Sequence, residues 1–262
     1  MITTTSLLEE VLESDALYFE LGARTREVEA ARIAWTQNFA DLPAGCVVQR
    51  VRVHEIRSPY RCWVESIEAQ LRDLGATWSR IYLAEEDSSG LDGVLRAAGY
   101  SRRVELAFVS EAVDARSPRG DIRVRPVRAQ HDWSCKAALH KHDDMGSDGY
   151  YHDPVRWTSL MREKVRTGSK EPYLIETDEM VAGEVAIMES ANMLRLKNLY
   201  VAPEARGGSL GAEAVAFVQR EALRRGKRGM GVFGVEGSPG ARTYQKCGLR
   251  VEGERVEWSR QL

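Results

Sequence analysis

A glycine-rich turn between a predicted strand and a predicted helix is the segment that points most clearly to chemistry. Residues 198–212 read NLYVAPEARGGSLGA. Pro203 stops the strand, and Gly207 and Gly208 let a ligand approach the backbone without meeting a Cβ atom. The helix that follows directs its first amides and the positive end of its dipole toward the turn. Converging amides of this kind bind a pyrophosphate, although a glycine-rich connection without a ligand has the same composition.

Two familiar phosphate-binding motifs do not explain this turn. The chain contains no GxxxxGK[ST] sequence, and the strand before the turn lacks a following GxGxxG. A second segment, SPGARTYQKCGL at residues 238–249, completes the pattern. Its Tyr244 lies 38 positions after Arg206.

Together, the two segments resemble the GNAT superfamily of acyltransferases. The family signature is an L-x-V-x-P-x-x-[RQ]-x-x-G-x-G/A loop, then a helix and a strand, then N-x-x-A-x-x-x-Y-x-K-x-G-F. The resemblance covers residues 122–262. It implies transfer of an acyl group from acyl-coenzyme A (CoA) to an amine.

The resemblance also implies a set of cofactor-binding residues for acetyl-CoA. The amides of residues 206–212 hold the pyrophosphate, and the end of the preceding strand pairs with the pantetheine arm, beside a bulge that splays two parallel strands. A backbone N–H in residues 199–201 polarises the thioester carbonyl. The residues implied are Leu199, Tyr200, Val201, Arg206, Gly207, Gly208, Ser209, Leu210, Gly211, Ala212 and Lys246.

Three positions depart from the family signature. Ser209 replaces the first glycine of the G-x-G pair; a serine is favourable at a helix start, so we expect a reshaped phosphate site rather than a lost one. Gly237 stands where the family often has Asn, and Gly240 where it often has Ala. These two changes affect side-chain contacts around the second segment and leave the predicted fold unchanged.

Tyr244 matches the general acid of the family. A phenol with an ordinary pKa of about 10 stays protonated at neutral pH and can donate to a thiolate, whose conjugate acid has a pKa of about 8.5; a buried structural tyrosine is the alternative. The family's strand glutamate falls at Arg195 here. Glu184 is therefore the candidate base, because a carboxylate inside an apolar strand needs a reason. A solvent-facing Glu184, or deprotonation of the amine by water, is equally compatible with the sequence.

An acidic segment with several histidines and tyrosines follows the first predicted helix of the C-terminal part. By the resemblance it lines the acceptor side, and we predict that Asp143, Asp144 and Asp148 attract a cationic amine beside Tyr150. A solvated loop is the alternative. His140, His142 and Asp144 lack a regular metal-ligand spacing, so we expect no metal site.

The elements that position these residues follow from hydrophobic periodicity and turn signals. The polar segment 111–120, EAVDARSPRG, predicts a linker, with one domain over 1–116 and a catalytic domain over 117–262. For the latter we predict strands at 121–127, 172–177, 181–189, 193–201, 229–235 and 251–259 and helices at 129–141, 153–167, 209–226 and 239–247.

The N-terminal part repeats this order with strands at 47–56, 78–86 and 104–110, a helix at 61–74 and a short helix ending near Gly99. It has no glycine at the equivalent turn, and Leu95 stands where Tyr244 does, so we predict a degenerate copy that binds no CoA. For a copy without CoA we consider three roles: it covers a sheet edge, shapes the acceptor pocket or forms the interface of a homodimer. The predicted fold class is α/β (α+β): two tandem GNAT-like domains, each a mixed, mostly antiparallel sheet flanked by helices, as in tandem acetyltransferases of the mycothiol-synthase type.

Composition narrows the remaining possibilities. The 262 residues carry a formal net charge of −2, which argues against nucleic acid as a partner. The four cysteines form no CxxC pair, and we recognise neither a signal peptide nor a membrane-spanning run, so we expect a cytoplasmic protein without membrane partners.

The resemblance therefore predicts an N-acetyltransferase that moves an acetyl group from acetyl-CoA to the primary amine of a small molecule by direct attack in a ternary complex. Two alternatives stay open: an enzyme that acetylates protein lysines or N-termini, and an inactive CoA-binding regulatory module. Ser209 in the turn and the absence of the family's strand glutamate favour the second alternative.

Overall fold

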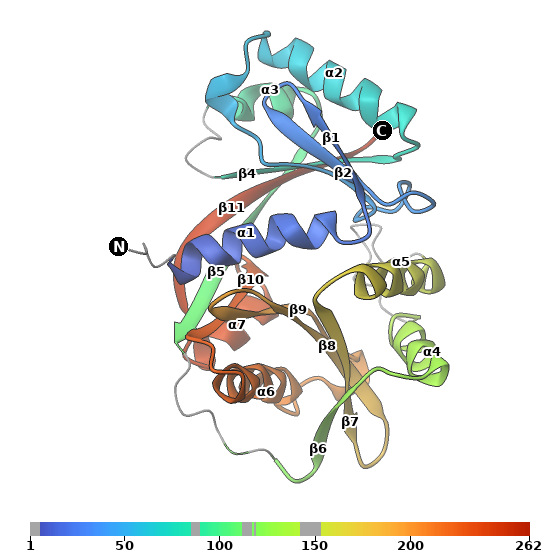
Figure 1. Ribbon diagram of the computed structural model, residues 1–262, viewed down its shortest axis with the longest axis vertical. Coiled ribbons are helices and arrows are strands. Elements are labelled where there is room, and N and C mark those ends of the chain that lie inside the picture. The colour runs from blue at the N-terminus through green and yellow to red at the C-terminus, as the bar shows by residue number, and fades with distance from the viewer. Residues whose placement is uncertain (1–5, 85–89, 112–116, 118, 142–152) are drawn as a thin grey trace.

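A single mixed sheet runs through the computed structural model, which describes residues 6–84, 90–111, 117, 119–141 and 153–262 (Figure 1). Its eleven strands are, from edge to edge, β1 (Arg24–Val28), β2 (Ala31–Trp35), β3 (Cys46–Gln49), β4 (Trp78–Ala84), β11 (Arg250–Gln261), β5 (Ser101–Glu111), β10 (Gly229–Val235), β9 (Met193–Val201), β8 (Val181–Glu189), β7 (Lys170–Thr177) and β6 (Ile122–Pro126).

Helices cover both faces of this sheet. They are α1 (Leu7–Glu20), α2 (Tyr60–Asp73), α3 (Asp92–Ala97), α4 (Gln130–Leu139), α5 (Pro154–Thr167), α6 (Leu210–Arg224) and α7 (Pro239–Lys246). The turn before α6 contains a short 3₁₀ helix, Pro203–Ala205. In Figure 1, α2 and α3 lie in the upper lobe, α6 and α7 lie in the lower lobe, and α1 crosses between the lobes.

The two halves of the chain repeat one arrangement. In the first half, β3 and β4 are parallel neighbours joined through α2, and α3 and β5 follow. In the second half, β9 and β10 are parallel neighbours joined through α6, and α7 and β11 follow. The repeated order of elements predicted from the sequence is therefore confirmed.

The last strand of each repeat pairs with the opposite repeat. β5 pairs with β10 over all seven residues of β10, from Gly229↔Glu111 to Val235↔Glu105. β11 lies between β4 and β5 and is antiparallel to both. The sheet is thus shared across the predicted division between 1–116 and 117–262, which stays a prediction; residues 112–116 and 118 of the predicted linker lie outside the described residues.

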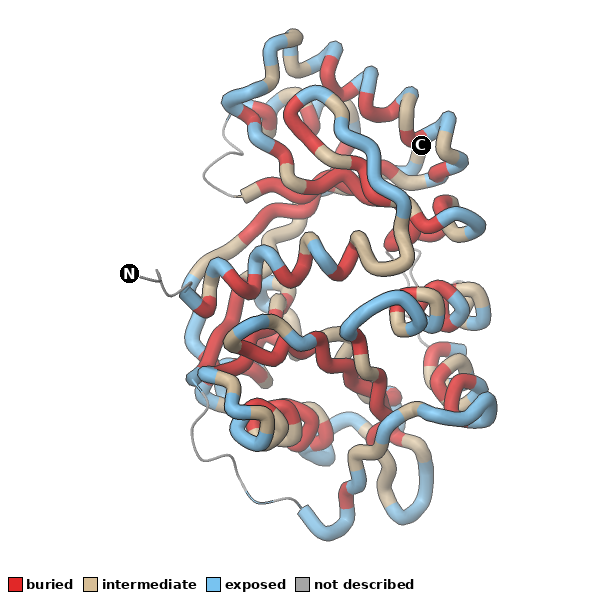
Figure 2. The backbone as a smooth tube through the Cα atoms, viewed as in Figure 1, coloured by how far each residue is buried: buried red, intermediate tan, exposed pale blue. Residues whose placement is uncertain are grey.

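Four apolar clusters of buried residues follow from this arrangement among the described residues; the smallest packs Leu7 and Val11 of α1 against β5 and β9. The upper core packs α2 and α3 against β4 and β11 around Trp63 and Trp258, and the lower core packs α6 and α7 against β8–β10. A third core joins the lobes and contains Tyr18 of α1, Tyr82 of β4 and Trp157 of α5. Figure 2 shows the buried residues following the strands through both lobes.

Two parts of the sequence interpretation were incomplete. The strand predicted over 47–56 ends at Gln49, because Arg50 adopts a left-handed conformation with φ +53° and the chain then forms a 3₁₀ turn at Val53–Glu55. The elements before residue 46, α1 included, were not predicted. Ser6 and Glu9 form a capping box at the start of α1, which is the local signal that would have located it.

Because β11 completes the sheet of the upper lobe, a cavity made in β11 should destabilise that lobe most. Trp258 is fully buried in the upper core although it lies near the C-terminus. Trp258→Ala should lower the free energy of unfolding by about 3–5 kcal/mol and speed amide hydrogen exchange in β4 more than in β8, measured by mass spectrometry. Val251→Ala is the matched control, since Val251 lies in the same strand and is 43% exposed. If amide hydrogen exchange became faster only in β8 and β9, the result would contradict the placement of β11 in the upper lobe.

Candidate functional site

The parallel strands β9 and β10 separate in the middle of the sheet. Their ladder joins only Met193–Arg195 to Gly229–Gly231. Beyond this point β10 continues beside β5, and β9 continues beside β8. The ladder between β8 and β9 shifts register between Glu184 and Ala186, and Asn198 has a φ of +51°. The edge of β9 after Arg195 therefore opens away from β10, which is the splay and bulge that the resemblance implies.

The turn before α6 presents a set of backbone donors beside this opening. Ala205 and Arg206 donate their amides to Ala202 and Pro203 within the turn. Among the described residues, the amides of 207–212 have no hydrogen-bond acceptor, and residues 206–209 are exposed. They lie at the N-terminus of the 15-residue helix α6. The arrangement suits an anion with several oxygen atoms.

Two residues give the turn its shape. Gly207 has a φ of +90°, which favours glycine. Ser209 has a φ of +66°, and its side chain makes no capping hydrogen bond to α6. The expectation that Ser209 is a favourable helix start was therefore wrong: the backbone keeps the left-handed conformation that suits a glycine, at a cost of about 1–2 kcal/mol for a residue with a Cβ atom.

Tyr244 lies on α7, on the same side of the sheet as α6. Both Tyr244 and Leu210, the first residue of α6, belong to the lower core. The ring lies 5.5 Å from the ring of Phe108, centroid to centroid. It also lies against β10 at Gly234, where an added Cβ atom would be 3.1 Å from the ring. Burial raises the pKa of Tyr244 to about 12, against the opposing charge of Arg195.

The second predicted catalytic residue, Glu184, lies in a buried ionic cluster. It is 2% exposed and is the cross-strand neighbour of Tyr200. Its carboxylate pairs with Lys136 of α4, and its Oε1 lies 3.3 Å from Nε2 of His140. The His140 ring contacts the Tyr200 ring in a tilted arrangement, with centroids 4.4 Å apart and an angle of 46° between the planes. The structure thus brings Glu184 and Tyr200 together with Lys136 and His140, which the prediction of Glu184 as the general base did not include.

The electrostatics of this cluster limit what Glu184 can do. Burial by itself would raise its pKa, but Lys136 and His140 lower it to about 2. The carboxylate is therefore ionised at neutral pH and is a weak proton acceptor.

An unforeseen charge cluster lies on the α1 side of the opening. Asp15 of α1 is fully buried. Its Oδ1 lies 2.7 Å from Nζ of Lys197 and 3.1 Å from Nη2 of Arg195, both on β9, and its Oδ2 pairs with Arg255 of β11. Burial opposes ionisation, but the three cations hold the pKa of Asp15 well below its ordinary value. No local sequence signal marks Asp15, because its partners are at least 180 positions away.

Of the remaining predicted site residues, some belong to the part of the chain that the structure describes and the acceptor residues do not. Leu199 and Val201 pack against the lower core, and Lys246 is exposed at the end of α7. Leu95 is buried in α3, the counterpart of α7. The predicted acceptor residues Asp143, Asp144, Asp148 and Tyr150, and also His142, lie outside the described residues.

Comparison with solved structures identifies the fold. The chain is similar to a GCN5-related N-acetyltransferase from Kribbella flavida (TM-score 0.67, 15% identity, 98% of this chain and 96% of that chain). It is also similar to a tandem GNAT protein from the clavulanic acid biosynthesis pathway (TM-score 0.61, 15% identity, 88% and 78%), and to a conserved protein of unknown function from Staphylococcus epidermidis (TM-score 0.70, 14% identity, 92% and 95%).

These similarities establish a tandem GNAT fold, and they confirm the predicted fold class of a mixed α/β sheet flanked by helices. No protein-family model and no curated protein matches the chain. Among the described helices, none has the length and apolar character needed to cross a membrane.

The Asp15 cluster predicts a pH-dependent stability. Removing the buried carboxylate with Asp15→Asn leaves three cations without their shared partner and should cost about 3–5 kcal/mol at pH 7. Because the folded-state pKa lies below the unfolded value of about 3.9, this stabilisation is present at neutral pH and is lost as the pH falls below that value. Urea unfolding of both proteins should therefore show a difference that shrinks toward pH 3. Glu13→Gln, whose carboxylate is 53% exposed and pairs with Arg50, is the control. A difference that does not change with pH would contradict the assignment.

The backbone of Ser209 predicts a gain in stability. Ser209→Gly should raise the free energy of unfolding by about 1 kcal/mol, because glycine adopts a φ of +66° without strain. Ser209→Ala removes the same hydroxyl but keeps the Cβ atom, so it should give no gain. Denaturant unfolding distinguishes the two variants, and equal effects would show that the hydroxyl, not the backbone, matters.

Proposed function

We propose that this protein is an acyl-CoA-dependent N-acyltransferase that moves an acetyl group from acetyl-CoA to the primary amine of a small molecule by direct attack in a ternary complex. The GNAT fold supports acetyl transfer in general. One arrangement carries the proposal for this chain. The amides of residues 207–212 have no hydrogen-bond acceptor, and β9 separates from β10 beside them. The buried phenol of Tyr244 lies on the same side of the sheet as this turn.

The chain's own groups fit acetyl-CoA as a substrate. The amides of 207–212 are the donors for its pyrophosphate. Leu199 to Val201 lie on the β9 edge that has separated from β10. This separation supports the proposal that their backbone groups pair with the extended, amide-containing arm of the cofactor. Bound acetyl-CoA supplies the thioester that the amine attacks. A backbone N–H of this edge then stabilises the charge that develops on the carbonyl oxygen.

Tyr244 is the proposed general acid. With a pKa of about 12 it keeps its proton at neutral pH. A thiol has a pKa of about 8.5, so complete transfer of this proton to a free thiolate is unfavourable. Tyr244 therefore donates its hydrogen bond to the sulfur as the carbon–sulfur bond breaks, and the proton that it gives up is replaced by the one that the attacking nitrogen of the tetrahedral intermediate loses. The packing against Phe108 and Gly234 holds the ring on the α6 side, where the cofactor enters.

Glu184 is proposed as a positioning residue. Its low pKa makes it a weak base, while its contacts fix Lys136 and His140 over β8 and β9. The acceptor amine then loses its proton to water. The acidic residues 143–148 with Tyr150 stay the proposed contacts for the cationic amine before that proton is lost.

Replacing Tyr244 tests the mechanism. Tyr244→Phe keeps the packed ring and removes the proton donor, so kcat for thiol release from acetyl-CoA with an amine panel should fall by about 10²–10⁴-fold, while the Kd for CoA measured by calorimetry stays unchanged. Tyr173→Phe is the matched control, because Tyr173 lies on β7 and donates its hydroxyl to Glu171. Undiminished turnover in Tyr244→Phe would contradict the role.

The same assay separates the two alternative functions. Activity with a peptide panel and not with small amines would assign a protein-directed enzyme. Tight CoA binding without turnover on any amine would assign a regulatory module, and the absence of heat with CoA would overturn the proposal as a whole.

A further inference from the structure

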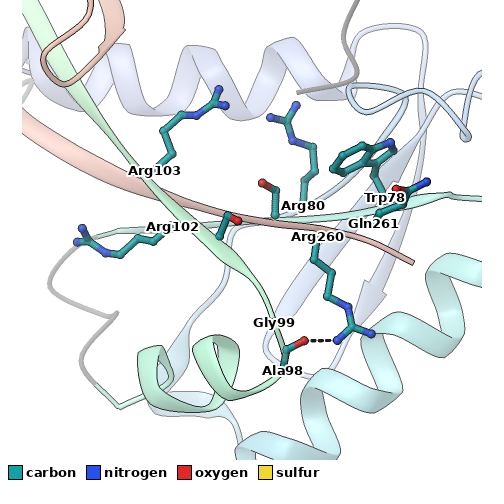
Figure 3. A pocket seen from close by; sticks show the side chains of 10 residues that line it. Trp78, Arg80, Ala98, Gly99, Arg102, Arg103, Arg260 and Gln261 are labelled. Carbon is teal, nitrogen blue, oxygen red and sulfur yellow. Dashed lines mark hydrogen bonds between the residues drawn. The ribbon is translucent and has the colours of Figure 1, made fainter. Parts of the chain in front are cut away.

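A cavity of about 580 Å³ lies beside the end of α3, lined by residues of β4, β5 and β11 (Figure 3). Two of its arginines already have acidic partners. Arg80 pairs with Glu257, and Arg260 donates to Glu68 at 3.2 Å and to the carbonyl of Ala98. Because these charges are compensated, the cavity is a poor site for an anion. The turn before α2 is a better candidate within the first repeat.

The turns before α2 and α6 have the same layout. In the second repeat, four residues separate the 3₁₀ helix Pro203–Ala205 from α6, which begins at Leu210. In the first repeat, four residues separate the 3₁₀ helix Val53–Glu55 from α2, which begins at Tyr60. Both the 3₁₀ helices and the helix starts are thus 150 positions apart. Each position of the first turn therefore has a counterpart in the second.

Two amides of the first turn have a carboxylate as their acceptor. Arg57 and Ser58 are the counterparts of Gly207 and Gly208. Oε1 of Glu29 accepts from the amide of Arg57 at 2.7 Å and from the amide of Ser58 at 3.0 Å, and Oε2 accepts from the Ser58 hydroxyl at 2.8 Å. Both oxygens of one carboxylate therefore bind the turn at the positions whose counterparts have acceptor-free amides in the second repeat.

The fold brings Glu29 to this turn from another element. Glu29 lies between β1 and β2, next to Ala30, whose φ is +57°. Nε1 of Trp63, a buried residue of α2, donates to the carbonyl of Glu29 at 2.8 Å. The amide of Arg52 donates to the carbonyl of Ala30, also at 2.8 Å. The backbone that carries the carboxylate is therefore fixed both to α2 and to the segment that leads into its turn.

The bound carboxylate is an anion at neutral pH. The Ser58 hydroxyl, followed by the amides of Arg57 and Ser58, holds the pKa of Glu29 below its ordinary value, because each of these donors stabilises the ionised form. Glu29 is exposed, so its ionisation carries little cost of burial. The turn thus binds a charged group with two oxygen atoms, as converging amides do in phosphate sites.

The corresponding hairpin of the second repeat leaves its turn open. β2 begins at Ala31 and β8 begins at Val181, again 150 positions apart, so Glu179 is the counterpart of Glu29. Glu179 is exposed, and among the described residues it accepts no hydrogen bond from the turn before α6. The two repeats therefore share the layout of hairpin, turn and helix and differ in whether the hairpin carboxylate reaches the turn.

We propose that the turn before α2 is an anion site that the chain fills with its own Glu29 carboxylate. The carboxylate takes the place that a phosphate group takes at Gly207 and Gly208 in the proposed function, on which this comparison rests. The first repeat is thus closed to phosphate-bearing ligands by an internal acid, in addition to lacking glycines in its turn. Removing the carboxylate frees two amides and a hydroxyl for an anion of the size of phosphate.

A phosphate titration followed by amide NMR tests the proposal at single residues. In the parent at neutral pH, inorganic phosphate should leave the amide signals of Arg57 and Ser58 unchanged. In Glu29→Ala both signals should shift and saturate, with an affinity at least about 10-fold higher than any response in the parent, the value of a charged hydrogen bond. Glu29→Gln loses the charge but keeps the length of the side chain, so its response should be weaker than that of Glu29→Ala.

A charge control and an internal control accompany these variants. Glu27→Ala removes a carboxylate from the same hairpin, one that is 61% exposed and pairs with Arg32, and it should respond as the parent does. Saturable shifts of Arg57 and Ser58 in the parent or in Glu27→Ala would overturn the proposal. Their absence in Glu29→Ala with a well-dispersed spectrum, or in Glu29→Gln where Glu29→Ala does not fold, would overturn it too. The signals of residues 207 and 208 report on the cofactor turn in the same spectra, so the two proposals fail separately.

Discussion

The buried carboxylate of Asp15 is the interaction on which the arrangement of the site depends. It joins α1 to β9 through Lys197 and Arg195 and to β11 through Arg255. Arg255 also pairs with Glu105 of β5 and lies over the rings of Tyr82 and Phe233. Each of these cations would be costly to bury without a partner. This carboxylate therefore ties α1 to the sheet where β9 and β10 separate, beside the apolar contacts of Leu7 and Val11 with β5 and β9.

This constraint defines two sides of the opening. Leu194 and Leu196 of β9 pack toward α6 in the lower core, whereas Arg195 and Lys197 alternate with them and face α1. Tyr244 and the turn before α6 lie on the first side. The proposed pyrophosphate donors and the proposed general acid therefore lie on the face of β9 opposite the Asp15 cluster.

The C-terminal half of the fold was predictable because its signals are local. Apolar alternation and the turn at Met180 placed β8 and β9 at their observed bounds, and Pro203 with Gly207 marked the turn before α6. Tyr244 was predicted as the general acid from the resemblance of its segment to the family signature and from its spacing to that turn. Asp15, by contrast, has partners only through long-range pairing, and the ion pair of Glu184 with Lys136 depends on how α4 lies over β8. The strand exchange has no local signal, because β5 and β11 have ordinary strand sequences that would fit either neighbour.

The exchanged strands also make the first repeat a structural support of the second. All of β10, the strand that supports Tyr244 through Gly234, is paired with β5 of the first repeat. Arg255, which anchors α1, lies on β11 at the point where β11 pairs with β4 and β5. Removing the first repeat would leave both β10 and β11 with unpaired edges and Arg255 without Glu105. The first repeat is therefore part of the scaffold of the candidate site.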